Sequence, residues 1–101
     1  MQFMILFTRD PERPPTPTPA DLRDAEFEAI RGLYAEGSIR QIWLRGDVAG
    51  ACAIVEASSE AEAANRINVL PLVRAGVLRP PLIVPLKPYA GFAPRSGVER
   101  T

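Results

Sequence analysis

The sequence contains no histidine and one cysteine among its 101 residues. Histidine is the side chain that most often serves as a general base and as a ligand of transition metals, so its absence argues against zinc, iron or copper chemistry. Cys52 has no partner for an intrachain disulfide, and we expect it to be a small core residue. We therefore predict a protein that uses neither a metal nor another cofactor.

The sequence also lacks an excess of charge, because 12 basic residues balance 12 acidic ones. This balance predicts no surface for nucleic acid or for an anionic membrane. No apolar run approaches the ~20 residues that cross a bilayer. The run 3–7 is too short for the apolar core of a signal peptide, and Arg9 and Asp10 follow it. We expect a cytoplasmic protein that binds a small molecule.

The length and the apolar content of 47% predict one small globular domain. We place this domain at residues 1–88 and treat 89–101 as a C-terminal tail that needs a packing partner to be ordered. A second irregular segment, 10–19, holds five prolines. Proline fixes φ and removes a hydrogen-bond donor, so this segment is an extended loop. The loop either connects two elements or lies as a lid over the end of the first strand.

Two strands joined by a short turn, 39–45 and 51–57, lie at the centre of the sequence. The connection contains Gly46, Asp47 and Gly50, which are residue types that favour turns. A short connection of this kind between two strands favours an antiparallel hairpin. Strict alternation divides the first strand into two faces, with Ile39, Gln41, Trp43 and Arg45 against Arg40, Ile42 and Leu44. Polar groups on both faces fit either an edge strand that deters aggregation or a functional surface.

The hairpin is flanked on each side by one helix and one strand. The first helix begins with Thr18 as N-cap and Pro19 as its first residue, and it ends near residue 36 with Gly37 as its C-cap. The second helix begins with a capping box formed by Ser59 and Glu62, and the proline at position 71 ends it. Strands at 2–8 and 82–86 complete the order β-α-β-β-α-β, which is typical of the ferredoxin-like α+β fold with a four-stranded antiparallel sheet.

The strand at 2–8 is apolar on both faces, which predicts a central strand. Pro85 cannot donate to a strand ladder, so the last strand either lies at an edge of the sheet or has a bulge at this residue. The two helices cover only one face of the sheet, and the other apolar face must be buried against something. A second copy of the chain is the least demanding cover. We therefore predict a homodimer that pairs through its sheets, and larger assemblies remain open.

Several short motifs stand out between Trp43 and Leu86. They are Trp43 with Gly46-Asp47, Ile54-Val55-Glu56, Ser59 with Glu62, Leu70-Pro71-Leu72 and Val84-Pro85-Leu86. This set resembles the muconolactone Δ-isomerase family, most specifically where the second helix runs into residues 70–72. The resemblance implies a dimeric α/β barrel and the cofactor-free isomerisation of a small lactone carboxylate. The proline-rich loop and the segment 74–81 depart from that family's pattern.

Proton transfer next to a carbonyl needs a base whose pKa is tuned to the reaction. Glu26 falls within the apolar stripe of the first helix, one turn after Leu22 and one turn before Ile30. Burial on this stripe would raise the pKa of its carboxyl, so Glu26 is our candidate catalytic residue. The alternative is that Glu26 pairs with Arg23 or reaches solvent near the start of the helix.

Arginine and aromatic side chains are the candidates for substrate binding. They are Arg9, Arg23, Arg40 and Arg45 for a substrate carboxylate, and Tyr34, Trp43 and Tyr89 for the walls of an apolar pocket. Each has a plainer interpretation, either as a surface arginine or as a core or tail aromatic residue.

Two functions are compatible with the sequence. The first is a muconolactone-isomerase-like protein that moves a proton on a small carboxylated lactone or aromatic-derived compound. The second is a non-catalytic dimeric small-ligand-binding or accessory protein on the same scaffold. The fold does not decide between them. Polar groups that converge in a cavity would favour the enzyme, and a filled, dry cavity would favour the second function.

Overall fold

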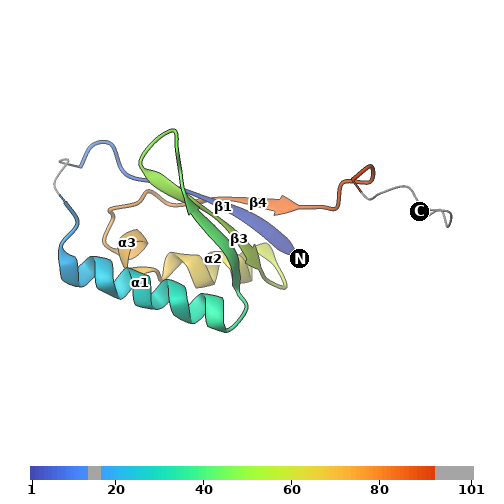
Figure 1. The fold of residues 1–101 in the computed structure, drawn as a ribbon, viewed down its shortest axis with the longest axis horizontal. Helices are drawn as coiled ribbons and strands as arrows, with labels where there is room; N and C mark the ends of the chain where they lie inside the picture. Colours follow the sequence, from blue (N-terminus) through green and yellow to red (C-terminus); the bar gives the residue numbers. More distant parts are fainter. Residues whose placement is uncertain (14–16, 93–101) are drawn as a thin grey trace.

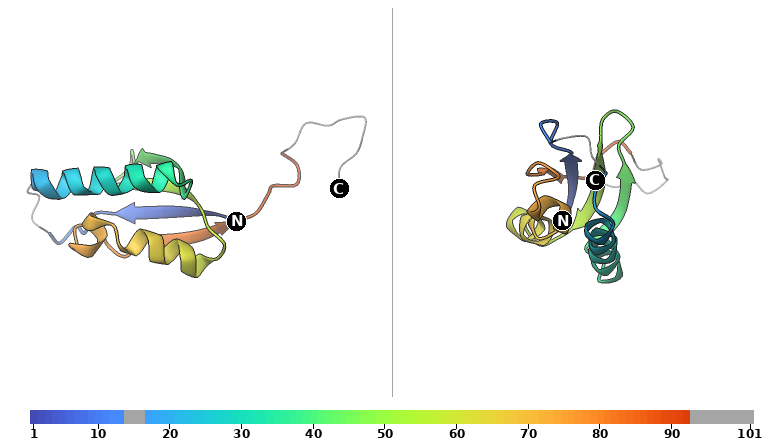
Figure 2. Two further views of the ribbon diagram at one scale, coloured as in Figure 1. Left: turned by 90° about the horizontal axis from the view of Figure 1, so that it is seen from below. Right: turned by 90° about the vertical axis from the view of Figure 1, so that its left-hand side faces the viewer.

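The computed structural model of the chain describes residues 1–13 and 17–92, and within them a four-stranded antiparallel sheet packs against helices. The elements are β1 (Gln2–Thr8), α1 (Ala20–Ala35), β2 (Ile39–Leu44), β3 (Gly50–Glu56), α2 (Glu60–Asn68), α3 (Pro71–Arg74) and β4 (Leu82–Leu86). The strand order is β2-β3-β1-β4. Figures 1 and 2 show the helices on one side of the sheet. The predicted ferredoxin-like fold is confirmed, and α3 is an addition that the sequence pattern did not predict.

The core lies between the sheet and the helices. Phe3, Ile5 and Phe7 of β1 are at most 2% exposed, and Val55 and Ala53 of β3 pair with Phe3 and Ile5 on the same face. The side of α2 that meets this face contains buried alanine, whose small side chain lets the helix lie close to the sheet. Burial of this face supplies most of the stability that a domain of this size can gain from its apolar residues.

The positions of the strands agree with the sequence patterns. β1 lies between β3 and β4, as its apolar residues on both faces predicted. β2 and β4 are the edge strands, and Pro85 of β4 pairs opposite Phe3. A proline is tolerated in an edge strand because one side of that strand has no neighbour. The N–H that proline lacks is then not needed as a donor. The polar groups of β2 therefore belong to an edge strand.

A bulge in β2 changes the faces that strict alternation predicted. The pairing with β3 shifts its register between Ile39 and Gln41. Ile39, which is 1% exposed, therefore shares the helix side of the sheet with Ile42 and Leu44. Gln41 and Trp43 lie on the opposite side. The predicted grouping of Ile39 with Gln41 and Trp43 was wrong, because the extra residue in a bulge reverses the side-chain direction that follows it.

The ends of α1 differ partly from the prediction. The helix begins at Ala20, and Pro19 is its N-cap rather than its first residue. No side chain forms a capping hydrogen bond there, so the predicted capping by Thr18 was wrong. At the other end the predicted glycine cap is confirmed. Gly37 has a φ of 87°, and its N–H donates to the carbonyl of Tyr34 at 3.0 Å.

The second helix is shorter than the sequence pattern predicted. α2 ends at Asn68, and Pro71 begins α3 instead of ending α2. Proline favours a first helical position, because the N–H that it lacks would have no partner in the helix. Ser59 caps α2 by accepting the Glu62 N–H at 3.1 Å. The carboxylate of Glu62 accepts bonds from Ser58 rather than from Ser59, so the capping box is displaced by one residue.

The face of the sheet opposite the helices is apolar. It carries Met4, Leu6, Cys52, Ile54, Leu82, Val84 and Leu86. No helix of the described ranges covers it, as the sequence predicted (Figure 2). Cys52 is half-buried on this face, so its predicted place in the core was wrong.

β4 leads into a segment that runs away from the sheet (Figure 1). In this segment Tyr89 and Phe92 are 81% and 87% exposed. The part of the proline-rich loop at 14–16 and the part of the predicted tail at 93–101 lie outside the described residues. Within 1–13 and 17–92, no helix is long and apolar enough to cross a membrane. The same ranges contain no cluster of three histidine, cysteine or acidic side chains that could hold a metal ion.

Candidate functional site

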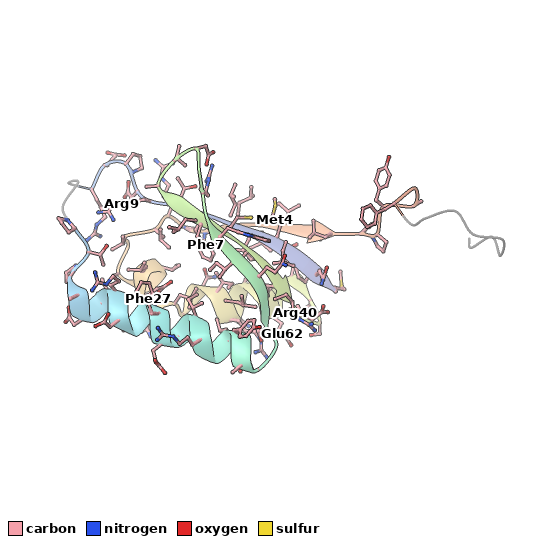
Figure 3. The ribbon with its side chains drawn as sticks, viewed as in Figure 1. Met4, Phe7, Arg9, Phe27, Arg40 and Glu62 are labelled. Atoms are coloured by element: carbon pink, nitrogen blue, oxygen red, sulfur yellow. The ribbon has the colours of Figure 1, made fainter. Side chains whose placement is uncertain are left out.

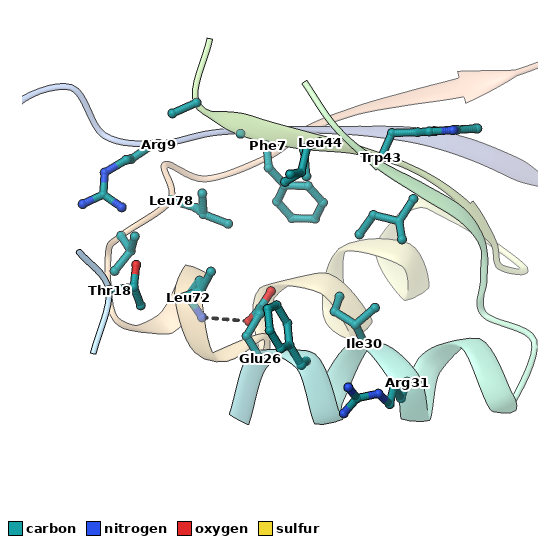
Figure 4. Close-up of a pocket in the computed structure, with 16 residues that line it drawn as sticks. Phe7, Arg9, Thr18, Glu26, Ile30, Arg31, Trp43, Leu44, Leu72 and Leu78 are labelled. Carbon is teal, nitrogen blue, oxygen red and sulfur yellow. Dashed lines mark hydrogen bonds between the residues drawn. The ribbon is translucent and has the colours of Figure 1, made fainter. Parts of the chain in front are cut away.

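A cavity of about 500 Å³ lies between α1, α3 and the end of the β2–β3 hairpin (Figure 4). Its lining consists of Phe7, Arg9, Thr18, Glu26, Phe27, Ile30, Arg31, Ile42, Trp43, Leu44, Ala49, Gly50, Ala51, Leu72, Val77 and Leu78. In Figure 3 the cavity lies between Phe7, which comes from the sheet, and Phe27, which comes from α1. The cavity is therefore on the helix side of the sheet.

Most of the lining is apolar, and one side of the cavity is open to solvent. Two apolar lining residues on the helix side of the sheet, Leu44 and Phe27, are 88% and 48% exposed. A ligand that covered these side chains would gain free energy by removing their apolar surface from water. A cavity of this size and composition suits a small, mainly apolar molecule with one or two polar groups. Trp43 contributes to the lining, although β2 directs its side chain to the face of the sheet opposite the helices.

Glu26 lies in the middle of α1 and turns its side chain toward the cavity (Figure 4). The residue is 8% exposed. Its Oε1 accepts a hydrogen bond from the backbone N–H of Leu72 at 3.0 Å. Burial raises the pKa of the Glu26 carboxyl, and the hydrogen bond from Leu72 lowers it by a smaller amount. The predicted position of Glu26 on the buried side of α1 thus agrees with the structure.

Arg9 and Arg31 are the cationic residues of the lining. Arg9 follows β1, and its N–H donates to the carbonyl of Ala49 at 2.9 Å. Arg31 lies on α1, where its Nη1 donates to the carboxylate of Glu28 at 3.2 Å. The sequence analysis selected Arg9 and missed Arg31. The helical spacing of positions 26, 27, 30 and 31 is the signal that could have found it.

Arg45 binds the protein itself and does not line the cavity. Its Nε and Nη2 donate to the two carboxylate oxygens of Asp47 at 2.9 and 2.6 Å, and its Nη1 donates to the hydroxyl of Thr8 at 2.8 Å. The hydrogen bonds from Arg45 lower the pKa of Asp47 to about 2, and the same pair raises the pKa of Arg45. With 15% of its side chain exposed, Arg45 fixes the hairpin turn to the end of β1. Because its donors are engaged in this way, Arg45 is not positioned to bind a substrate.

Four other candidates for substrate binding lie outside the lining: Arg23, Arg40, Tyr34 and Tyr89. Arg23 forms an exposed ion pair with Asp24 at 3.8 Å, so its predicted pairing with Glu26 does not form. The Nε of Arg40 donates to the carbonyl of Gly37 at 3.1 Å. Tyr34 is 66% exposed on α1, and Tyr89 lies in the segment that leaves the sheet. Arg23 and Tyr34 lie on other faces of α1 than Glu26, Arg40 lies at the bulge of β2, and Tyr89 follows β4.

Solved structures with the same fold include two that align with most of the chain. Muconolactone isomerase aligns with a TM-score of 0.73 and 20% sequence identity, over 98% of this chain and 100% of that chain. The 5-chloro-2-hydroxyhydroquinone dehydrochlorinase of Burkholderia phenoliruptrix, in complex with 2,5-dihydroxybenzoquinone, aligns with a TM-score of 0.64 and 20% identity, over 86% and 94% of the two chains. No family model matches the sequence, and no curated protein gives a significant match. The chain has the muconolactone isomerase fold.

Proposed function

We propose that the chain is a cofactor-free isomerase of the muconolactone isomerase type, which moves a proton on a small carboxylated lactone or aromatic-derived compound. The observation that carries this proposal is the Glu26 carboxyl, which lies in an apolar cavity with its pKa raised by burial. The names of the two proteins of the same fold, which refer to muconolactone and to 5-chloro-2-hydroxyhydroquinone, support a small oxygenated ring compound as substrate.

The proposed reaction needs one group that both takes and returns a proton. Ionised Glu26 takes the proton from a carbon next to the substrate carbonyl, and the electron pair of that bond forms an enolate. The carboxyl of Glu26 exchanges its proton with water at the open side of the cavity and then gives a proton to a different carbon of the enolate, so the double bond moves and Glu26 is ionised again. A carboxyl with a raised pKa is suited to both steps, because its protonated and ionised forms are closer in free energy near neutral pH.

The substrate carboxylate and the enolate oxygen both need a cationic or hydrogen-bond-donating partner. We assign this role to Arg9 and Arg31, since a guanidinium can donate two parallel hydrogen bonds to a carboxylate. Arg31 is five positions after Glu26 in α1, so one helix carries both the proton carrier and a cation. This assignment replaces the predicted role of Arg45.

We further propose that the working form is a cytoplasmic homodimer. The apolar outer face of the sheet supports it, since an exposed face of this kind favours association with a complementary surface. A second copy of the chain offers the same apolar strands.

The test is to incubate the purified chain with muconolactone and other carboxylated lactones in D₂O and to follow the products by ¹H NMR. We expect isomerisation, with deuterium appearing at the carbon that receives the proton. Glu26→Gln keeps the shape of the side chain and should lower the rate by about 10²–10⁴-fold, the usual contribution of general acid–base catalysis. Asp24→Asn makes the same chemical change at an exposed position of α1 and should leave the rate unchanged.

Two results would contradict the proposal. A Glu26→Gln chain that keeps the full rate would remove Glu26 as the proton carrier. A parent chain that turns over none of the lactones, but melts at a higher temperature in their presence, would favour the small-ligand-binding protein, because a ligand that binds only the folded state raises its stability.

A further inference from the structure

The two oxygens of the Glu26 carboxyl have different surroundings. Oε1 accepts the backbone N–H of Leu72 at 3.0 Å. Oε2 accepts no hydrogen bond from the described residues. Every side-chain oxygen or nitrogen of those residues that is inaccessible to solvent has a hydrogen-bond partner, so Oε2 is accessible to solvent. Figure 4 shows this second oxygen pointing toward Phe7 and away from α3. The carboxyl therefore presents one oxygen to the protein and the other to the cavity.

We propose that the Leu72 amide is the positioning group of the Glu26 carboxyl, which anchors Oε1 and leaves Oε2 as the oxygen that carries the proton. The proposal rests on the proposed function only in taking a substrate to be the partner of Oε2. An N–H group donates and cannot accept, so the oxygen bound to it is the carbonyl oxygen of the neutral acid. The hydroxyl of that acid is then at Oε2, which faces the cavity.

The Leu72 amide is available because of the local sequence. Leu70 is the N-cap of α3, and Pro71 is its first residue and has no N–H. The first N–H groups of a helix have no acceptor within it, so Leu72 carries the first amide of α3 that can donate outward. The Val73 N–H has no acceptor among the described residues, and the amides of Arg74 and Ala75 donate to the carbonyls of Leu70 and Pro71 at 2.9 Å, so Leu72 is the α3 residue whose N–H donates to a side chain.

The same amide opposes the effect of burial on the carboxyl. Burial favours the neutral acid, whereas a hydrogen bond from an N–H favours the carboxylate. The other charged groups that line the cavity are Arg9, after β1, and Arg31, on α1. The lining residues from α3, β2 and β3 carry no charge. The Leu72 amide is thus the direct contact that keeps the ionised, proton-accepting form of Glu26 accessible.

The sharpest test replaces the amide between residues 71 and 72 with an ester, which removes the N–H and keeps the leucine side chain. A ¹³C NMR titration of the labelled chain reports the pKa of Glu26, whose signal is the one absent from Glu26→Gln. We expect the pKa of Glu26 to rise in the ester chain. The matched control is the same replacement one residue later, since the Val73 N–H has no acceptor among the described residues.

Two proline substitutions repeat the comparison in a recombinant chain. Leu72→Pro removes the N–H that donates to Glu26. Val73→Pro removes the neighbouring N–H and restricts the backbone dihedral angles to a similar extent, so it serves as the control. An unchanged Glu26 pKa in a folded ester-72 chain, or an equal rise in the ester-73 chain, would overturn the proposal. The titration needs no substrate, so its result tests the role of the Leu72 amide independently of the proposed function. The proposed function fails by a different result, namely that the parent chain isomerises no lactone. Where the parent is active, the acidic limb of its pH profile for kcat/KM should move to higher pH in the ester-72 chain.

Discussion

Gly50 faces the carbonyl of Phe7 so closely that a β-carbon at position 50 would lie 2.1 Å from the Phe7 oxygen. Gly50 is the first residue of β3, and its φ of 157° lies in a region that favours glycine. Both residues line the cavity. The close approach of these two backbones therefore sets the distance between the hairpin turn and β1 at one wall of the candidate site.

Gly50→Ala should destabilise the chain by about 1–3 kcal/mol, the usual cost of forcing extra atoms into a packed site. The atom in the way is a backbone oxygen, so the strands themselves must move. Gly46→Ala places a methyl group in open space in the same turn and should change the free energy of unfolding by less than about 0.5 kcal/mol. Urea unfolding measures both variants. Equal effects would show that the contact with Phe7 does not constrain the fold.

Glu26→Gln should gain stability relative to the parent chain as the pH rises. Burial raises the pKa of Glu26 in the folded state above the ordinary 4.5, so the folded chain holds this proton more tightly than the unfolded chain does. Raising the pH above about 4.5 then lowers the free energy of unfolding of the parent, and the loss is complete above the folded pKa. Glutamine does not titrate.

The measurement is urea unfolding of both chains at a series of pH values from 4 upward. The difference in free energy of unfolding should grow and then level off. Asp24→Asn, measured in parallel, controls for the loss of a carboxylate at an exposed site of α1. A difference for Glu26→Gln that is constant with pH would mean that burial does not perturb this carboxyl.

Asp47→Asn should destabilise the chain at neutral pH and have little effect near pH 2. Arg45 lowers the pKa of Asp47 from 3.8 to about 2, so the folded chain keeps a carboxylate that the unfolded chain protonates. The resulting stability is fully present above pH 3.8 and is lost as the pH falls through about 2. Unfolding experiments from pH 2 to pH 6 should show the difference between the two chains shrinking across this window. An effect of equal size at both ends would count against the ion pair as its cause.

Val84→Lys should convert the proposed dimer into a monomer. Val84 lies half-buried on the outer face of the sheet, and a lysine there would place a charge in the dimer contact. Val69→Lys is the control, because Val69 follows α2 and is 59% exposed. Sedimentation velocity at micromolar concentration measures the mass of each chain. A parent chain that is already a stable monomer under these conditions would refute the dimer.

Truncation after Lys87 should lower the melting temperature or weaken the dimer. Tyr89 and Phe92 are large apolar side chains that are more than four-fifths exposed in a single chain, so we expect them to pack against the same or a partner subunit. The double substitution of Tyr89 and Phe92 by serine separates the effect of these side chains from that of chain length. A melting curve and a mass that do not change in either variant would argue against any packing of this segment.

The sequence by itself determined the order of the four strands and of the two longer helices, and the central place of β1. These features follow from local patterns, namely the spacing of apolar residues and the positions of proline and glycine. The same reasoning placed Glu26 on the buried side of α1, because the phase of a helix depends only on the spacing of its residues. Local patterns did not reveal the bulge in β2, since register depends on the partner strand.

The tertiary structure decided which polar groups meet at the site. Glu26 and Leu72 are 46 positions apart, and their hydrogen bond exists because α1 and α3 pack on the same face of the sheet. Arg45 does not line the cavity, because its guanidinium donates hydrogen bonds to Asp47 and, across the sheet, to Thr8. Hydrogen bonds between distant segments depend on how the elements pack. The spacing of residues within one element does not predict that packing.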